Sequence, residues 1–282
     1  MRTELPCVTP QQHLLIQQTI SRLVEATHPE KIICYGLRIK NNMKWSSFPD
    51  QVESESGISL DLLIIILDKD KRKRENVCDH ADTISNDMVR LITVVHSVDA
   101  VNENLENGNL FFTTLYQSGI LIYDHNTTPL SEPALKTISE TFTMANRRKG
   151  DLARLFFETA CDAMQKERHE IAVFALHQAV ELTCTALLRT CLGYKPNTHS
   201  INKLFMLLEN TPVRIDSIFP RTAAEDVAVF NILQRGYSDV RYKEEYSVTG
   251  DKVTMLIARV RQFQIAAFRL CQNQWNHPTS TP

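Results

Sequence analysis

Two stretches of this 282-residue chain place polar residues at spacings that permit chemistry. The first is GISLDLLIII (57–66), where Asp61 heads an apolar run typical of a buried strand. Ser59 lies two residues earlier, and residues two apart on a strand share a face. Magnesium-assisted phosphoryl chemistry needs two or three carboxylates around the cations, because the charge of a triphosphate must be neutralised. This stretch offers one carboxylate, with a hydroxyl where a second would stand.

Further metal ligands must come from elsewhere in the first half. The long segment before this strand holds three candidate carboxylates: Asp50, Glu53 and Glu55. A second apolar segment, LITVVHSVD (91–99), holds His96 and Asp99 as candidates for a third ligand.

The second polar stretch lies in HEIAVFALHQAVELTCTALLRTCLG (169–193), an apolar segment typical of a helix. His177, Gln178 and Glu181 are spaced by three and four residues, so they occupy one stripe of that helix. Buried polar side chains need hydrogen-bond partners. They either bond to the adjoining helix and loop, which fixes a bundle, or form a polar cleft with His199 and Arg241 that meets a phosphate.

The elements that carry these residues divide the chain into two parts. Up to about residue 128, short β-branched runs alternate with helical patterns, which is typical of a sheet with flanking helices. The expected helices cover 10–27, 75–90 and 109–118, and the expected strands cover 31–36, 57–66, 91–98 and 119–124.

Strand patterns stop after the turn-rich segment HNTTPLSEP, and long helical patterns follow. The clearest one ends at Gly193, with Pro196 beyond it, as expected for a helix stop. Others cover 201–210, 222–235 and 250–272. We therefore predict an α+β chain, with a mixed-sheet domain over 1–128 and an all-helical bundle of four or five helices over 129–282.

Composition limits the class of protein. The net charge of −2 gives no overall attraction to nucleic acid or to an anionic membrane. The longest purely apolar run, Leu62–Leu67, is too short to span a bilayer, and the first residues hold no signal-peptide core. The seven cysteines show no Cys-x-x-Cys spacing, so we expect reduced core thiols. These features predict a cytoplasmic protein.

The first part resembles the minimal nucleotidyltransferases of the polymerase-beta superfamily. Their Gly-Ser signature falls on Gly36-Leu37, their Asp-x-Asp-Leu-Leu signature falls on residues 59–63, and their closing pattern matches LFFTTLYQSGILIYD. The resemblance implies a nucleotide site with Mg²⁺ and ATP or another nucleotide, formed by Gly36, Leu37, Arg38, Ser59 and Asp61, with Asp61 as metal ligand and catalytic residue. Because Leu37 replaces Ser and Ser59 replaces Asp, we expect a module without turnover.

The helical part resembles the HEPN domain, the nucleotide-binding bundle of higher eukaryotes and prokaryotes. This resemblance rests on a His-Gln-Ala-x-Glu run, a Gly-x-x-Pro loop, a Thr-His turn and the later pairs Gly236-Tyr237 and Arg241-Tyr242. It implies a cleft lined by His177, Gln178, Glu181, His199, Arg241 and Tyr242, and pairing of two copies as a homodimer. Members that cleave RNA carry an Arg, then four to six residues, then a His. That spacing is absent from the helical part, so ribonuclease activity is not expected.

These features predict a two-domain protein that binds a nucleotide or RNA without turnover. Stress, toxin–antitoxin-like or defence regulation is the setting that the resemblance implies. One alternative is an active magnesium-dependent nucleotidyltransferase that uses Asp61 with a second carboxylate from elsewhere. The other is an interaction scaffold without a ligand.

Overall fold

The structure is a computed structural model of the chain. It describes residues 2–39, 43–46, 57–70, 74–86, 88–134 and 140–276. The chain divides into two compact units, Met1–Thr137 and Ile138–Pro282, each with its own core. The boundary expected between residues 128 and 129 remains a prediction.

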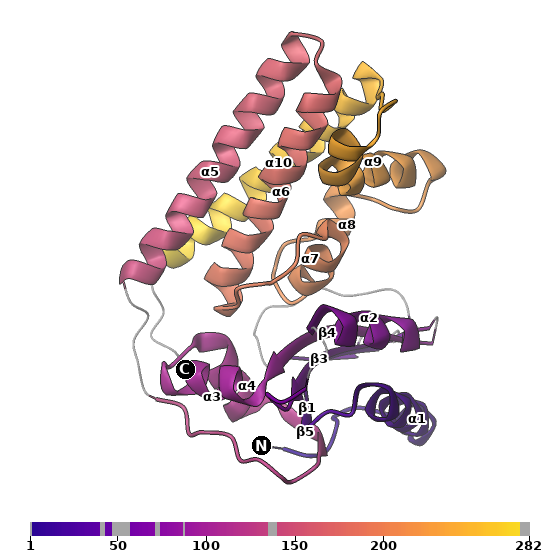
Figure 1. Ribbon diagram of the computed structural model, residues 1–282, viewed down its shortest axis with the longest axis vertical. Coiled ribbons are helices and arrows are strands. Elements are labelled where there is room, and N and C mark those ends of the chain that lie inside the picture. The colour runs from indigo at the N-terminus through magenta and orange to yellow at the C-terminus, as the bar shows by residue number, and fades with distance from the viewer. Residues whose placement is uncertain are drawn as a thin grey trace. The chain divides into compact units, whose positions relative to one another are not determined.

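The first unit is a mixed sheet with flanking helices (Figure 1). Its elements are α1 (Pro10–Thr27), β1 (Lys31–Ile39), β2 (Met43–Ser46), β3 (Ile58–Ile66), α2 (Arg74–Ile84), β4 (Val89–Ser97), α3 (Val98–Glu106), α4 (Leu110–Ser118) and β5 (Ile120–Asp124). β1 pairs antiparallel with β3 on one side, and with β5 and then β2 on the other. β3 and β4 are parallel.

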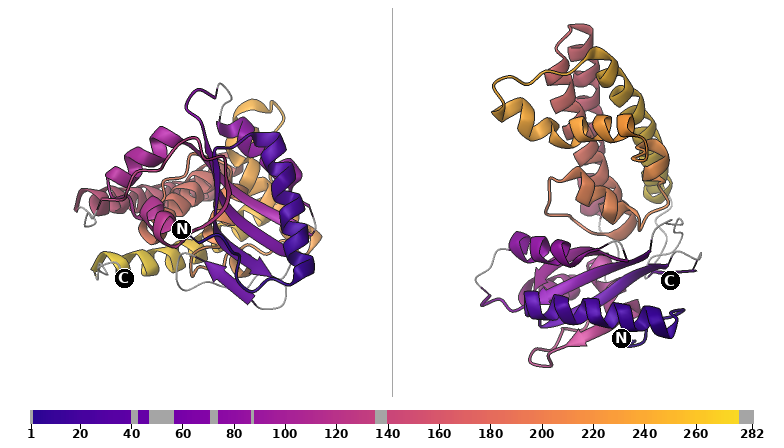
Figure 2. Two further views of the ribbon diagram at one scale, coloured as in Figure 1. Left: turned by 90° about the horizontal axis from the view of Figure 1, so that it is seen from below. Right: turned by 90° about the vertical axis from the view of Figure 1, so that its right-hand side faces the viewer.

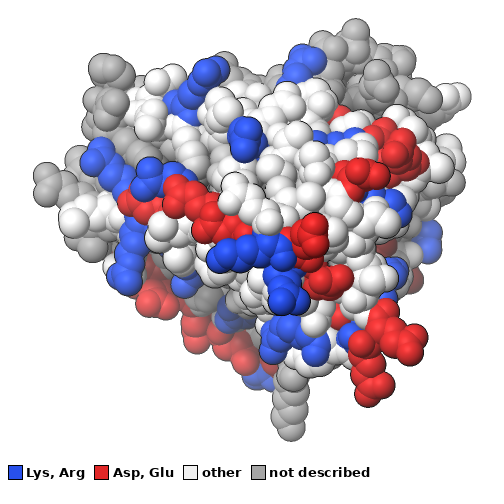
Figure 3. Space-filling model, turned by 90° about the horizontal axis from the view of Figure 1, so that it is seen from above, with Lys and Arg blue, Asp and Glu red and all other residues white. Residues whose placement is uncertain are grey.

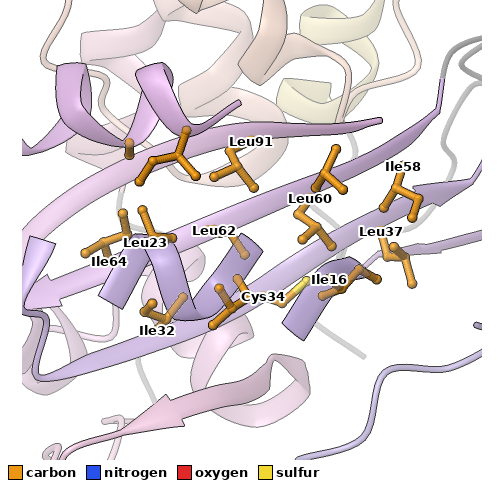
Figure 4. Close-up of a cluster of buried hydrophobic side chains, with 14 of the residues drawn as sticks. Ile16, Leu23, Ile32, Cys34, Leu37, Ile58, Leu60, Leu62, Ile64 and Leu91 are labelled. Atoms are coloured by element: carbon orange, nitrogen blue, oxygen red, sulfur yellow. The ribbon is translucent and has the colours of Figure 1, made fainter. Parts of the chain in front are cut away.

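Side-chain alternation sorts the strand residues onto two faces. Helices α1 and α2 cover one face, where apolar side chains from both helices meet those of β1, β3 and β4 (Figures 2 and 4). The side chains labelled in this core are Ile16, Leu23, Ile32, Cys34, Leu37, Ile58, Leu60, Leu62, Ile64 and Leu91. On the opposite face, Tyr35 of β1 meets Phe111 of α4 edge to face, with ring centroids 5.5 Å apart.

A bulge in β1 decides which side chains reach each face. The register between β1 and β3 shifts between Cys34 and Gly36. A bulge adds one residue to its strand, so the alternation after it is offset. Leu37 therefore joins Cys34 in the apolar core, and Arg38 faces the other way.

Several elements differ from the sequence expectation, among them α9 (Ala224–Tyr242), which was expected to end at residue 235 and continues to Tyr242. The helix expected over 75–90 ends at Ile84, because the Asn86 side chain accepts hydrogen bonds from the backbone N–H groups of Met88 and Val89 and starts a turn. The strand expected over 31–36 continues to Ile39, so it includes the Gly36-Leu37 pair. Strand β2 and helix α3 were not expected; Ser97 caps the start of α3.

The second unit is a helical bundle, as predicted. Its helices are α5 (Glu140–Gln165), α6 (His169–Leu192), α7 (Ile201–Leu208), α8 (Ile215–Ile218), α9 (Ala224–Tyr242) and α10 (Gly250–Asn276). Helix α6 packs against α5, α7, α9 and α10, and α5, α6 and α10 run side by side (Figures 1 and 2). It ends at Gly193, whose positive φ of 69° glycine tolerates.

The central position of α6 explains its apolar composition. By length and hydropathy it passes as a membrane-crossing helix, but 67% of that apolar window is buried inside the protein. A helix that is apolar on most sides is typical of the core of a bundle.

Candidate functional site

In the first unit, Asp61 forms a buried ion pair with Arg38. The Arg38 guanidinium donates to Asp61 Oδ2 at 2.6 Å and to Oδ1 at 2.7 Å, and also to Ser59 Oγ at 3.3 Å. The Arg38 side chain is 2% exposed and that of Asp61 is fully buried. Such a bidentate pair is the strongest arrangement for an arginine and a carboxylate.

The strand register explains why these groups meet. Arg38 lies directly opposite Ser59 on β3, and Gly36 lies opposite Asp61. Because Gly36 has no side chain, the space beside Asp61 stays open for the guanidinium that arrives diagonally from Arg38.

The described residues around Asp61 do not fit a magnesium ion. Both Asp61 oxygens already accept bonds from a cation, and Ser59 adds no charge. No group of three metal-binding side chains occurs in the described ranges. The candidates Asp50, Glu53 and Glu55 lie outside those ranges.

The predicted third ligands lie far along the sheet from Asp61. Asp61 pairs with Ile92, whereas His96 pairs with Ile65, four residues farther along the parallel strands. Asp99 follows β4, where its N–H donates to Asp68. Since a strand rises about 3.3 Å per residue, His96 and Asp99 are too far away to share a cation with Asp61.

The residues predicted to contact phosphate do not form a turn. Gly36 and Leu37 lie inside β1 rather than in a loop, and the Leu37 side chain is 1% exposed in the apolar core. Among the residues described, the predicted nucleotide site is a packed stretch of sheet, formed by Gly36, Leu37, Arg38, Ser59 and Asp61. Its role in binding remains a prediction.

In the second unit, the predicted residues His177, Glu181 and His199 form a connected group. His177 Nδ1 lies 2.9 Å from the Leu233 carbonyl of α9, and its Nε2 lies 3.7 Å from Glu181 Oε2. The other oxygen of Glu181 lies 2.9 Å from His199 Nδ1. His177 is 2% exposed, whereas the His199 side chain is 81% exposed.

Tyr237 of α9 joins this group to Arg241. Its ring lies parallel to the His199 ring, with centroids 6.3 Å apart and an angle of 10°, and 5.8 Å from the His177 ring. The Arg241 guanidinium lies over Tyr237 at 4.7 Å and over Tyr242 at 5.0 Å. We call His177, Glu181, His199, Tyr237 and Arg241 the helical cluster.

Gly236 permits the close approach of α9 to α6 that forms the helical cluster. A Cβ at Gly236 would lie 2.8 Å from Val173 Cγ1 and 3.4 Å from His177 Cβ. The contact holds the next residue, Tyr237, against His177. The Asn202 N–H donates a hydrogen bond to Gln234 Oε1 at 3.0 Å. This bond ties the start of α7, and thus the neighbouring His199, to α9.

Residues 151–266 match the family model of the HEPN domain. The helical unit is a HEPN domain. Among solved structures, a nucleotidyltransferase-like protein from Exiguobacterium sibiricum 255-15 matches with 14% identity and a TM-score of 0.32, over 93% of this chain and 78% of that chain. No curated protein matches the sequence.

Two of the predicted cleft residues of the HEPN domain, Gln178 and Tyr242, lie outside the helical cluster. Gln178 is half-buried, and its Nε2 has no hydrogen-bond partner among the described residues. Tyr242 is 72% exposed and contacts the cluster through Arg241. The predicted set omitted Tyr237, the ring at the centre. Its spacing of four residues from Arg241 was the available signal, since such residues are neighbours on a helix.

Electrostatics set the charge state of His177. Burial lowers the pKa of His177, although its bond to the Leu233 carbonyl and the nearby Glu181 act in the opposite direction. The ring is therefore neutral near pH 7. Because a carbonyl oxygen only accepts, Nδ1 carries the proton and Nε2 is an acceptor.

Proposed function

We propose that the HEPN domain binds a nucleotide or a segment of RNA at the helical cluster. The observation that carries this proposal is the exposed stack of Arg241 over Tyr237, with His199 parallel to the same ring. Aromatic rings that stack with bases, beside a cation that contacts phosphate, are the usual means of binding single-stranded nucleic acid.

The face of the molecule that Figure 3 shows has no extended basic track. On the face shown in Figure 3, basic and acidic side chains alternate without forming a broad area of one sign. The net charge of −2 agrees with this view. A ligand would therefore be held by the stacking and hydrogen-bonding groups of the helical cluster more than by long-range attraction.

The proposal assigns the first unit a role without metal-dependent transfer. Its support is the Arg38–Asp61 pair, since an active site would need Arg38 to release the carboxylate before a cation could bind. The alternative of an active magnesium-dependent nucleotidyltransferase predicts pyrophosphate release that requires both Mg²⁺ and Asp61.

Calorimetric titration of ATP and of a short single-stranded RNA into the full chain, with and without Mg²⁺, tests the proposal. Arg241→Met is expected to weaken binding by about tenfold, because one stacked cation contributes on the order of 1–2 kcal/mol. Arg235→Met removes the same charge from an exposed position of α9 and serves as the matched control. Asp61→Asn is expected to leave binding unchanged. Equal losses for Arg241→Met and Arg235→Met, or binding lost only in Asp61→Asn, would reject the proposal.

The resemblance to HEPN domains also supports a proposal on how the protein assembles and in which process it acts. A cytoplasmic homodimer formed through the HEPN domain, acting in stress, toxin–antitoxin-like or defence regulation, is the arrangement that we infer. Sedimentation velocity on the full chain and on a chain ending before residue 138 tests the assembly. Dimerisation that survives removal of the helical unit would contradict it.

A further inference from the structure

Two acceptors of the helical cluster face each other without a donor between them. His177 Nε2 carries a lone pair, because Nδ1 holds the ring proton, and it lies 3.7 Å from Glu181 Oε2. Both atoms are buried, and neither has a hydrogen-bond partner among the described residues. We call these two atoms the acceptor pair.

An unfilled acceptor pair is costly in a protein interior. A buried polar atom without its bond loses the free energy of hydration and gains nothing in return. Only a group that donates can satisfy both atoms at once, whereas a ligand acceptor placed there would be repelled. A water molecule could also donate to both atoms, and the titration below distinguishes that case.

We propose that a nucleotide bound at the helical cluster presents two neighbouring hydrogen-bond donors to the acceptor pair. This inference rests on the proposed function. Two parts of a nucleotide have this chemistry: the N1–H and N2–H₂ edge of guanine, and the 2′,3′-diol of ribose. The corresponding edge of adenine places an acceptor, N1, beside its amino group and does not fit.

His199 is the exposed neighbour of the acceptor pair. Its ring is bound to Glu181 through Nδ1, and the His199 side chain is 81% exposed. An outward turn of this ring breaks that hydrogen bond and exposes the carboxylate.

Four titrations of the full chain separate the two sources of donors. GMP, AMP, dGMP and dAMP are compared by calorimetry. Recognition by the guanine edge predicts that both guanine nucleotides bind about tenfold or more tightly than both adenine nucleotides. Recognition by the diol predicts the same ratio for ribonucleotides over deoxyribonucleotides. Equal affinities for all four, with binding still weakened by Arg241→Met, would overturn this inference and leave the proposed function standing. Absence of binding to all four would overturn both.

A variant with nearly unchanged shape tests the role of the carboxylate. Glu181→Gln replaces an acceptor by an amide that can donate to His177 Nε2 itself, so the selectivity seen with the wild-type chain is expected to disappear. Glu158→Gln makes the same change at an exposed position of α5 and is the control. Selectivity retained in Glu181→Gln would overturn the inference.

Discussion

The Arg38 guanidinium holds both carboxylate oxygens of Asp61, at 2.6 and 2.7 Å, with both side chains buried in the sheet. The Asp61 carboxylate, which was expected to bind magnesium, therefore binds a fixed cation of the chain itself. Charge neutralisation inside the sheet is the role that this geometry gives to Asp61.

Loss of Arg38 should strongly destabilise the first unit. Arg38→Met leaves a buried carboxylate without its cation, and breaking such a pair costs about 3–5 kcal/mol. Hydrogen exchange at the β3 amides, followed in increasing urea, measures this cost within that unit.

Two further variants make this prediction specific. Arg22→Met changes an exposed arginine of α1 and is expected to have little effect. The double variant Arg38→Met/Asp61→Leu removes both charges and should recover most of the loss, because replacing a buried pair by apolar groups is often neutral. Equal exchange in Arg22→Met and Arg38→Met would show that the pair is not structural.

His96 should make the first unit sensitive to mild acid. Burial, and to a lesser extent Arg74, lowers the pKa of His96 from 6.5 to about 4, and its ring packs edge to face on Phe112. Between these two pKa values, the unfolded chain binds a proton at His96 that the folded chain does not bind. The contribution of His96 to the free energy of unfolding is fully present above pH 6.5. It falls as the pH drops towards 4, by at most about 3 kcal/mol.

Urea unfolding of the first unit at pH 7 and pH 5 measures this effect. His96→Gln should reduce the difference between the two pH values. His80→Gln, at an exposed position of α2, should retain it. The same pH dependence in all three proteins would assign the effect to other groups.

Gly236→Ala should disturb the helical cluster. The new methyl group would meet Val173 Cγ1 at 2.8 Å and the Val173 carbonyl oxygen at 3.1 Å, so α9 must move away from α6. Overpacking of this kind costs about 1–3 kcal/mol. Nucleotide affinity should fall as well, since Tyr237 and Arg241 move with α9. Gly250→Ala is the control, because its nearest contact is a side-chain atom, His169 Nε2 at 3.2 Å, rather than backbone. Thermal unfolding and titration that do not separate the two variants would contradict the prediction.

Glu30→Gln should release the segment after β5. The buried Glu30 carboxylate accepts bonds from the Thr127 N–H at 2.9 Å, the Thr128 N–H at 2.7 Å and the Thr127 hydroxyl at 2.6 Å. Burial raises the pKa of Glu30, but these bonds and Lys31 outweigh it and lower the pKa. This stabilisation is therefore present at neutral pH and lost as the pH falls below the ordinary range of a glutamate.

The amide protons of Thr127 and Thr128 report that release. Bonds to a charged acceptor contribute about 1.5–3 kcal/mol each, so exchange at these amides should accelerate by an order of magnitude or more in Glu30→Gln. Glu103→Gln, at an exposed position of α3, should leave their exchange unchanged. Unchanged exchange in Glu30→Gln would show that the segment is held by other contacts.

The sequence by itself determined the fold class and the division into a sheet part and a helical part. Strand and helix periodicities are local, and the apolar runs of β3 and α6 leave little freedom about what is buried. The spacing of His177 and Glu181 likewise placed them on one helical stripe before any contact was known.

Only the tertiary structure decided what these residues contact. The bulge between Cys34 and Gly36 turns Arg38 towards Asp61, and a register shifted by one residue would have sent it to the apolar face. The approach of α9 at Gly236 brings Tyr237 over His177, sixty residues earlier in the chain. Such pairings depend on strand register and helix packing between distant segments, and local patterns do not encode them.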